Sequence, residues 1–248
     1  MLYAEEEIGF GNTEMRFIIN AMDRFNIVFN KITVNDDGLD SKKFFSKLIS
    51  ISYSDNDGMG FTDVDMVDSL VSATFLKSIT AFYRIWNAET GEMEKQSYEL
   101  VKEIRFYVDF EKHYLAVEGN IADMNKLKGA FRNYFWKSFT YDSLSLSPYN
   151  YLEIFQNDHY LYSIDEITIT DFPYSNILLG KYVAKIVNPT TDVDDISEYK
   201  YNIVKVKTRL NFENETIAFS ASSNNLLNLA CSDKVKYLFF KYLTSKLY

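Results

Sequence analysis

Residues 101–120 read VKEIRFYVDFEKHYLAVEGN, and a related pattern recurs at residues 203–222, which read IVKVKTRLNFENETIAFSAS. Apolar and polar residues alternate along both stretches, as they do in strands that bury one face, and a polar turn lies near the middle of each. Each stretch therefore predicts a β-hairpin. Because a helix-like stretch follows each one, we predict an α+β protein with mainly antiparallel sheets.

The first hairpin belongs to an N-terminal α+β lobe that we expect to span residues 1–142. This lobe would have a helical start, the hairpin over residues 101–118 and a helix over residues 123–139. Thr62 and Asp65 also resemble a capping box, in which two side chains satisfy the first amides of a helix. We therefore predict a further short helix from Thr62.

A strand with regular alternation precedes the first hairpin. Its apolar positions are Ile79, Ala81, Tyr83 and Ile85. The sequence Ala-Glu-Thr-Gly at residues 88–91 is typical of a turn and predicts the end of this strand.

The C-terminal α+β lobe is expected to span residues 143–248. It would contain strands, the hairpin over residues 203–220 and a helix over residues 232–247. The Ser-rich stretch at residues 141–148, which ends in proline, is the predicted boundary between the lobes. Since the lobes share the order hairpin then helix, we hypothesise that they arose by internal duplication.

The composition is aromatic and acidic. Tyr and Phe number 19 and 20, and the net charge of −9 argues against broad electrostatic capture of nucleic acid or an anionic membrane. Because aromatic side chains are enriched at the centres of protein interfaces, this composition favours a protein that binds another protein. The abundance of Asn, Lys, Tyr and Ile is typical of an AT-rich genome, such as that of a low-GC bacterium or its phage.

The compartment is expected to be the cytoplasm. The chain has a single cysteine, Cys231, so it cannot form an internal disulfide, and its first residues lack the basic-then-apolar order of a signal peptide. No apolar run approaches the ~18 residues that a membrane-spanning helix needs. We expect no membrane association.

No catalytic motif is present: glycine-rich phosphate loops, Gly-Xaa-Ser-Xaa-Gly and paired Cys-Xaa-Xaa-Cys motifs are all missing from the sequence. The two histidines, His113 and His159, have no motif around them and are interpreted as surface side chains. Cys231 has no basic neighbour that would lower its pKa, which favours a buried structural thiol. We therefore predict neither a catalytic residue nor a cofactor.

An acidic stretch offers the remaining candidate for metal chemistry. Asp55, Asp57 and Asp63 lie close together, and Asp-Asn-Asp-Gly resembles part of a calcium loop. Counting from Gly58 as its sixth position, however, the first and twelfth positions are Tyr53 and Val64, which excludes an EF-hand. A looser metal site at residues 55–68 is left as an alternative.

One basic feature contrasts with this acidic background. Lys205, Lys207 and Arg209 alternate along the predicted strand and should share one face, and Arg105 and Tyr107 occupy the comparable face of the first hairpin. Cations beside an aromatic ring could bind a phosphate backbone and stack a base. Lysines and arginines are also routine on the solvated face of an ordinary sheet, where they protect edges from aggregation, and we favour this interpretation.

These patterns favour a non-enzymatic protein that docks on a protein partner, with a regulatory or inhibitory role in a bacterial or phage setting. The first alternative is nucleic-acid binding through Lys205, Lys207 and Arg209. The second is a metal-dependent nuclease or hydrolase built on scattered carboxylates.

Overall fold

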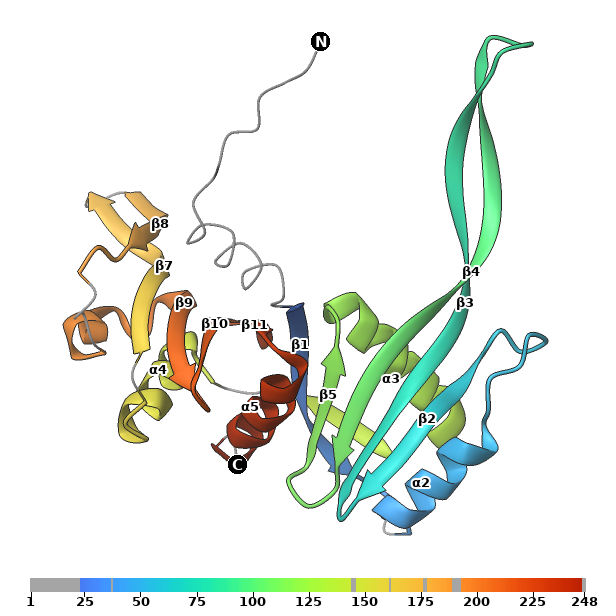
Figure 1. Cartoon of the computed structure of the whole chain (residues 1–248), viewed down its shortest axis with the longest axis horizontal. Helices are drawn as coiled ribbons and strands as arrows, with labels where there is room; N and C mark the ends of the chain where they lie inside the picture. The colour runs from blue at the N-terminus through green and yellow to red at the C-terminus, as the bar shows by residue number, and fades with distance from the viewer. Residues whose placement is uncertain are drawn as a thin grey trace, which may run out of the picture. The chain divides into compact units, whose positions relative to one another are not determined.

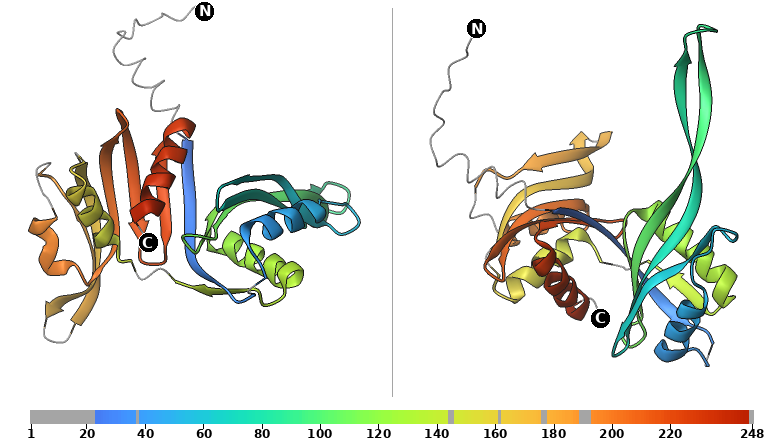
Figure 2. Two further views of the ribbon diagram at one scale, coloured as in Figure 1. Left: turned by 90° about the horizontal axis from the view of Figure 1, so that it is seen from below. Right: turned by 45° about the vertical axis from the view of Figure 1, so that its right-hand side comes forward.

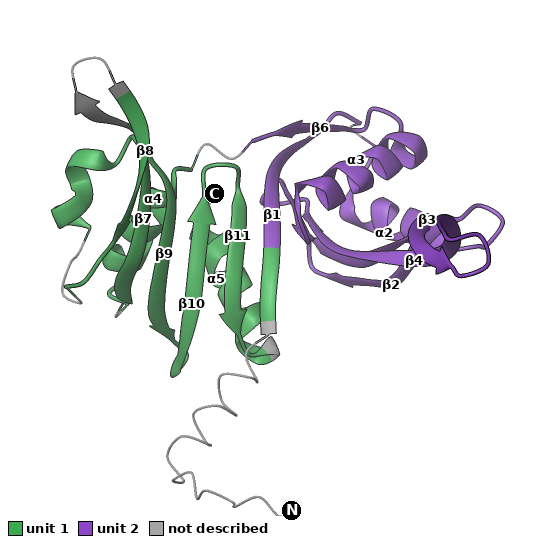
Figure 3. Ribbon diagram, turned by 90° about the horizontal axis from the view of Figure 1, so that it is seen from above, with its two compact units in different colours: residues 1–26, 145–248 green, residues 27–144 purple. Residues whose placement is uncertain are grey.

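The computed structural model shows an α+β architecture with a large antiparallel sheet, as the sequence predicts (Figure 1). It describes residues 23–246 except for residues 37, 144–145, 161, 176–177 and 189–192. The chain divides into two compact units, unit 1 with residues 1–26 and 145–248 and unit 2 with residues 27–144 (Figure 3). Within the described ranges, no helix combines the length and apolar character needed to cross a membrane.

Unit 2 contains a sheet with the strand order β2-β3-β4-β5-β1, and β6 also pairs with β1. The first four residues of β1 belong to unit 1, and its remaining residues belong to unit 2. The elements are β1 (Asp23–Val34), α2 (Ser41–Ser50), β2 (Met59–Val67), β3 (Leu70–Asn87), β4 (Glu92–Asp109), β5 (Tyr114–Glu118), α3 (Ile121–Phe135) and β6 (Phe139–Asp142).

Unit 1 continues the strand order from β1 as β11-β10-β9-β7-β8. Its elements are α4 (Pro148–Asn157), β7 (Tyr162–Ser175), β8 (Leu178–Lys185), the 3₁₀ helix η1 (Asp194–Tyr199), β9 (Ile203–Phe212), β10 (Glu215–Ser222), β11 (Leu226–Cys231) and α5 (Asp233–Lys246).

The core of unit 2 is built from phenylalanine rings of both helices and the sheet. Phe44 of α2 is fully buried, and its ring centre lies 5.5 Å from that of Phe131 and 4.8 Å from that of Phe135, both in α3. Phe106 of β4 packs edge-on against Phe131, with ring centres 5.3 Å apart. These contacts place the helices over one face of the sheet.

Unit 1 has a second aromatic core of the same kind. Phe155 of α4 and Phe239 of α5 are both fully buried. Their ring centres lie 5.3 Å and 5.8 Å, respectively, from the ring of Phe219 in β10. Much of the unusual phenylalanine content is therefore used to fill two separate cores.

Both predicted hairpins are confirmed, but the internal duplication is not. β4 pairs with β5 and β9 pairs with β10, each in antiparallel register. The first turn holds residues 110–113 between the paired strands, whereas the second consists of Glu213 and Asn214. The first hairpin leads directly into α3, whereas β11 intervenes between the second hairpin and α5.

Three predicted helical stretches need correction. The stretch that begins at Thr62 is strand β2, which joins β3 through a turn where Asp68 has a φ of 56°. The apolar residues there fit a helix and a strand equally well, and pairing along β3 decides for the strand. Helix α3 ends at Phe135 rather than at residue 139, because residue 139 is already the first residue of strand β6.

The predicted helical start falls partly on β1, which is a strand, and its first part lies outside the described residues. The C-terminal helix is confirmed as α5.

Candidate functional site

The most distinctive feature of unit 2 is a hairpin that extends beyond its sheet. β3 and β4 pair along their whole length, from Leu70 with Asp109 to Asn87 with Glu92. β2 accompanies β3 only as far as Lys77, and β5 pairs with β4 only from Phe106 onward. Residues 79–101, here called the arm, therefore continue as a twisted two-stranded ribbon (Figures 1 and 2).

The arm carries large apolar side chains that are exposed to solvent. Trp86 and Phe82 are 60% and 58% exposed. The full set is Phe82, Tyr83, Ile85, Trp86, Met93, Tyr98 and Val101. A free two-stranded hairpin is marginally stable in water, and contiguous exposed apolar surface is typical of an interaction site.

Both faces of the arm share this apolar character. Directly paired residues of antiparallel strands project to the same side, so the register assigns every side chain to a face. The Trp86 face consists of Thr80, Phe82, Arg84, Trp86, Met93, Lys95, Ser97, Glu99 and Val101. The Tyr83 face consists of Ile79, Ala81, Tyr83, Ile85, Asn87, Glu92, Glu94, Gln96, Tyr98 and Leu100. Neither face is covered by a second layer of the described residues, which differs from an ordinary sheet with one buried face.

Polar contacts across the two strands order these side chains. The Tyr83 hydroxyl donates a hydrogen bond of 2.8 Å to Gln96, and the ring packs edge-on against Tyr98 at 5.6 Å. The Lys95 ammonium lies 3.7 Å from the centre of the Phe82 ring. These contacts hold the aromatic rings in defined positions while their surfaces stay exposed.

Glu99 is the most strongly hydrogen-bonded carboxylate of the arm. It accepts hydrogen bonds from the hydroxyls of Thr80 and Ser78, at 2.5 Å and 2.8 Å. Since these bonds favour the ionised form, they lower the pKa of Glu99. The arm therefore presents a fixed negative charge at this position.

The base of the arm is attached to helix α3. Lys102 of β4 forms an ion pair with Asp123, which is 5% exposed and also completes a capping box with Asn120. Burial acts to raise the pKa of Asp123, but the hydrogen bonds from Lys102 and the Asn120 backbone outweigh it, so the pKa is lowered. One carboxylate thus links the helix start to β4.

The basic residues predicted from the sequence share the expected face of β9. Lys205, Lys207 and Arg209 alternate with buried Val206 and Thr208. Lys205 takes part in none of the ion pairs between described residues.

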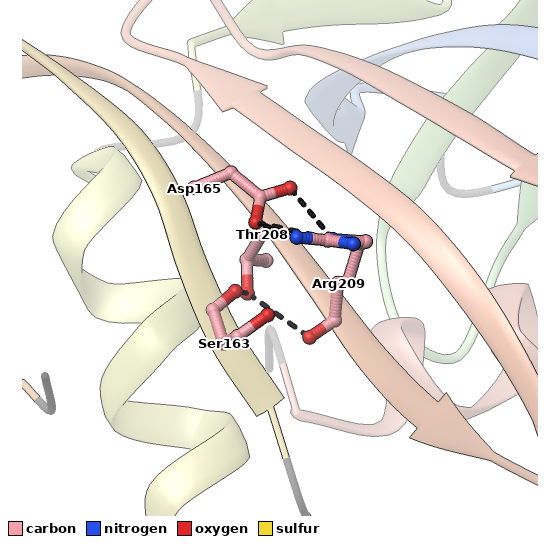
Figure 4. Close-up of polar contacts among 4 residues, drawn as sticks. All are labelled: Ser163, Asp165, Thr208 and Arg209. Carbon is pink, nitrogen blue, oxygen red and sulfur yellow. Dashed lines mark hydrogen bonds and ion pairs between the residues drawn. The ribbon is translucent and has the colours of Figure 1, made fainter. Parts of the chain in front are cut away.

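The other two cations are paired with carboxylates of the neighbouring strand β7. The Lys207 ammonium lies 2.8 Å from Glu166. The Arg209 guanidinium donates to both oxygens of Asp165, the closest contact being 2.7 Å (Figure 4). The Asp165 carboxylate raises the pKa of Arg209. These two acids offset most of the positive charge of this face.

The remaining two predicted residues lie in unit 2. Arg105 is exposed on β4, with its guanidinium carbon 6.0 Å from the centre of the Tyr107 ring. Tyr107 is 9% exposed, and its hydroxyl donates to Glu118 at 2.6 Å. This ring has little free surface on which a base could stack.

The remaining candidates for catalytic or metal chemistry are the carboxylates, the two histidines and Cys231. The described residues include no group of three or more His, Cys, Asp or Glu side chains arranged to hold a metal ion. His113 and His159 occupy turn positions with φ values of 54° and 58°, and Cys231 is fully buried at the end of β11.

A hollow of about 490 Å³ in unit 2 lies beside Trp136, which is 74% exposed. Its lining is Asn35, Phe131, Arg132, Trp136, Lys137, Ser138, Phe139, Thr140 and Tyr141. This lining includes no carboxylate, histidine or cysteine, and its side chains that can exchange a proton are those of Lys137 and Tyr141.

Sequence reasoning predicted the strand and the turn of the arm but missed its exposed residues. The available signal was the presence of aromatic residues at both odd and even positions, as with Phe82 next to Tyr83. A comparison with known protein families finds no matching family model, and a comparison with curated proteins finds no match either.

Proposed function

We propose that this chain is a non-catalytic protein-docking protein and that the arm is the segment that contacts its partner. The observation that carries this proposal is the exposure of aromatic side chains on both faces of a two-stranded ribbon. A protein that covers Phe82, Trp86 and Met93 would remove their apolar surface from water, which is the main favourable term in most protein association. A regulatory or inhibitory role follows as our sequence-based hypothesis.

The charge of the arm supports a protein partner over a nucleic acid. Its basic residues are Arg84 and Lys95, and its acidic residues are Glu89, Glu92, Glu94 and Glu99. This excess of negative charge repels phosphate groups. In non-specific nucleic-acid binding, most of the affinity comes from contacts between phosphates and basic side chains. The basic face of β9 is the alternative site for nucleic acid, and its ion pairs with Glu166 and Asp165 weaken that alternative.

Affinity capture with two matched variants tests the docking role. The full chain carries a tag, and extracts of the native host are applied to wild type, to Phe82→Ser/Trp86→Ser and to the control Trp136→Ser. The control removes a tryptophan of the same unit that lies outside the arm and is more exposed than Trp86. We expect the arm variant to lose the bound protein, the control to retain it, and nuclease treatment to leave the wild-type complex intact.

Melting curves of the three proteins establish that each variant is folded, since exposed side chains contribute little to stability. Capture of the same proteins by the wild type and the arm variant would contradict the proposal. Loss of all captured material after nuclease treatment would favour the nucleic-acid alternative.

A further inference from the structure

The outer edge of β4 is free along the arm. β3 occupies one edge of β4, and β5 pairs with the other edge only from Phe106 to Asp109. From Glu92 to Arg105, no strand of the described residues pairs with that second edge. Unpaired backbone amide and carbonyl groups on such an edge are a template for adding a strand from another chain.

The sequence of this edge is self-complementary when two copies pair about Ser97. Two identical antiparallel strands related by a two-fold axis must pair about a central residue, with equivalent faces on the same side. When Ser97 is the centre, every charged residue lies opposite either an opposite charge or a neutral residue. The pairs are Glu92 with Lys102, Met93 with Val101, Glu94 with Leu100, Lys95 with Glu99 and Gln96 with Tyr98.

The neighbouring registers offer fewer favourable charge pairs. Centres at Lys95 and Glu99 place like charges opposite each other, which destabilises a sheet. A centre at Gln96 gives no pair of opposite charges over residues 92–100. A centre at Tyr98 places Lys95 opposite Val101, and its one opposite-charge pair, Glu94 with Lys102, uses a lysine that already pairs with Asp123.

The Lys95–Glu99 pair is the strongest element of the Ser97 register. Both side chains lie on the Trp86 face, and the two-fold axis makes the pair occur twice. The hydroxyls of Ser78 and Thr80 already hold Glu99 in its ionised form, so the charge is in place before association. Lys102 is engaged by Asp123, so the argument does not depend on its pair with Glu92.

We propose that the arm binds a second copy of this chain, the β4 strands pairing antiparallel about Ser97 to form a four-stranded sheet from two arms. Pairing joins the Trp86 faces of the two copies into one continuous surface and satisfies the free backbone groups of both β4 edges. The inference rests on the docking role proposed above and names the partner.

Charge reversal tests the register in the full chain by sedimentation at several concentrations. Lys95→Glu and Glu99→Lys each place like charges opposite each other twice, so each should weaken self-association at least about tenfold. An equimolar mixture of the two variants restores both opposite-charge pairs and should associate as the wild type does. Lys42→Glu, an exposed site on α2, is the control for the change in net charge and should behave as the wild type.

Restoration in the mixture distinguishes a lost contact from a damaged fold. A wild-type chain that stays monomeric at all concentrations would overturn the proposal. So would single variants that associate as the wild type does, or a mixture that remains as weak as its components.

A disulfide across the axis tests the geometry directly. In the Ser97 register, Ser97 lies opposite itself, where Cα atoms are about 4.5–5.5 Å apart, a separation that a disulfide spans. Ser97→Cys should therefore form a covalent dimer on mild oxidation, since the native Cys231 is buried. Arg84→Cys, on the opposite strand of the arm, should not, and a dimer formed by Arg84→Cys alone would overturn the proposal.

The two proposals can fail separately. If the Ser97 and charge variants have no effect while Phe82→Ser/Trp86→Ser still loses a different protein, only the self-pairing is wrong. If the latter variant also retains every partner, the docking role of the arm is wrong.

Discussion

Removal of the Asp123 carboxylate should destabilise unit 2 by a magnitude that its contacts define. The side chain accepts a hydrogen bond from Lys102 and a backbone hydrogen bond from Asn120 at the start of α3. A hydrogen bond to a charged group contributes about 1.5–3 kcal/mol, and a helix cap contributes about 1 kcal/mol. We therefore expect Asp123→Ala to lower the free energy of unfolding by about 3 kcal/mol at neutral pH.

Asp123→Asn separates the two contributions, because the amide oxygen can still accept from Asn120 while the charge is lost. Its expected cost is about 1.5 kcal/mol, measured by urea denaturation with circular dichroism. A loss of less than about 0.5 kcal/mol in both variants would refute the assigned contacts.

The pH dependence of Asp123 gives a second measurement. Folding lowers the pKa of Asp123 below the ordinary value of 3.8. The contribution of the Asp123 carboxylate to the free energy of unfolding is therefore fully present at a pH above 3.8. As the pH falls through the pKa of the folded state, this contribution is lost. The difference in the free energy of unfolding between wild type and Asp123→Ala should therefore shrink. A difference that is equally large in strong acid would show that packing, rather than charge, is responsible.

Three further predictions concern other parts of the chain. Phe44→Ala should cost about 3–5 kcal/mol in urea denaturation, whereas the exposed Ile49→Ala on the same helix should cost less than about 1 kcal/mol. Alanine at Lys205, Lys207 and Arg209 together should change stability little, and neither this variant nor the wild type should bind nucleic acid in a fluorescence assay near physiological salt. Magnesium, manganese, calcium or a chelator should leave the melting temperature unchanged; a rise of several degrees with one ion would implicate residues 55–68.

The first strand of the arm and the turn that ends it could be predicted from the sequence, but the exposure of the arm could not. Alternation from Ile79 to Ile85 and the turn at residues 88–91 are local signals, and β3 and β4 confirm them. The same alternation is typical of a strand with one buried face. Whether a face is covered depends on where β2 and β5 stop pairing, and those limits are set by chain segments distant in sequence.

The basic face of β9 illustrates the same limit at a candidate site. Alternation placed Lys205, Lys207 and Arg209 on one side, which the burial of Val206 and Thr208 confirms. The carboxylates that pair with two of them come from β7, through a register that shifts at a bulge between Ile164 and Glu166. A one-residue shift exchanges the faces of a strand, so sequence alone could not reveal this neutralisation.

The sharing of β1 between the two units has a consequence for the order of events during synthesis. Unit 2 is a continuous segment, and its folding can begin as soon as residues 27–144 have left the ribosome. The strand order places β1 beside β11, which is translated only when residues 226–231 are added. At about 5–20 residues per second, β11 follows the end of unit 2 by about 4–17 seconds, and during this time the edge of β1 that pairs with β11 stays open. A nascent chain of this protein therefore carries an open strand edge at the end of an already folded unit, where a ribosome-associated chaperone would be of most use.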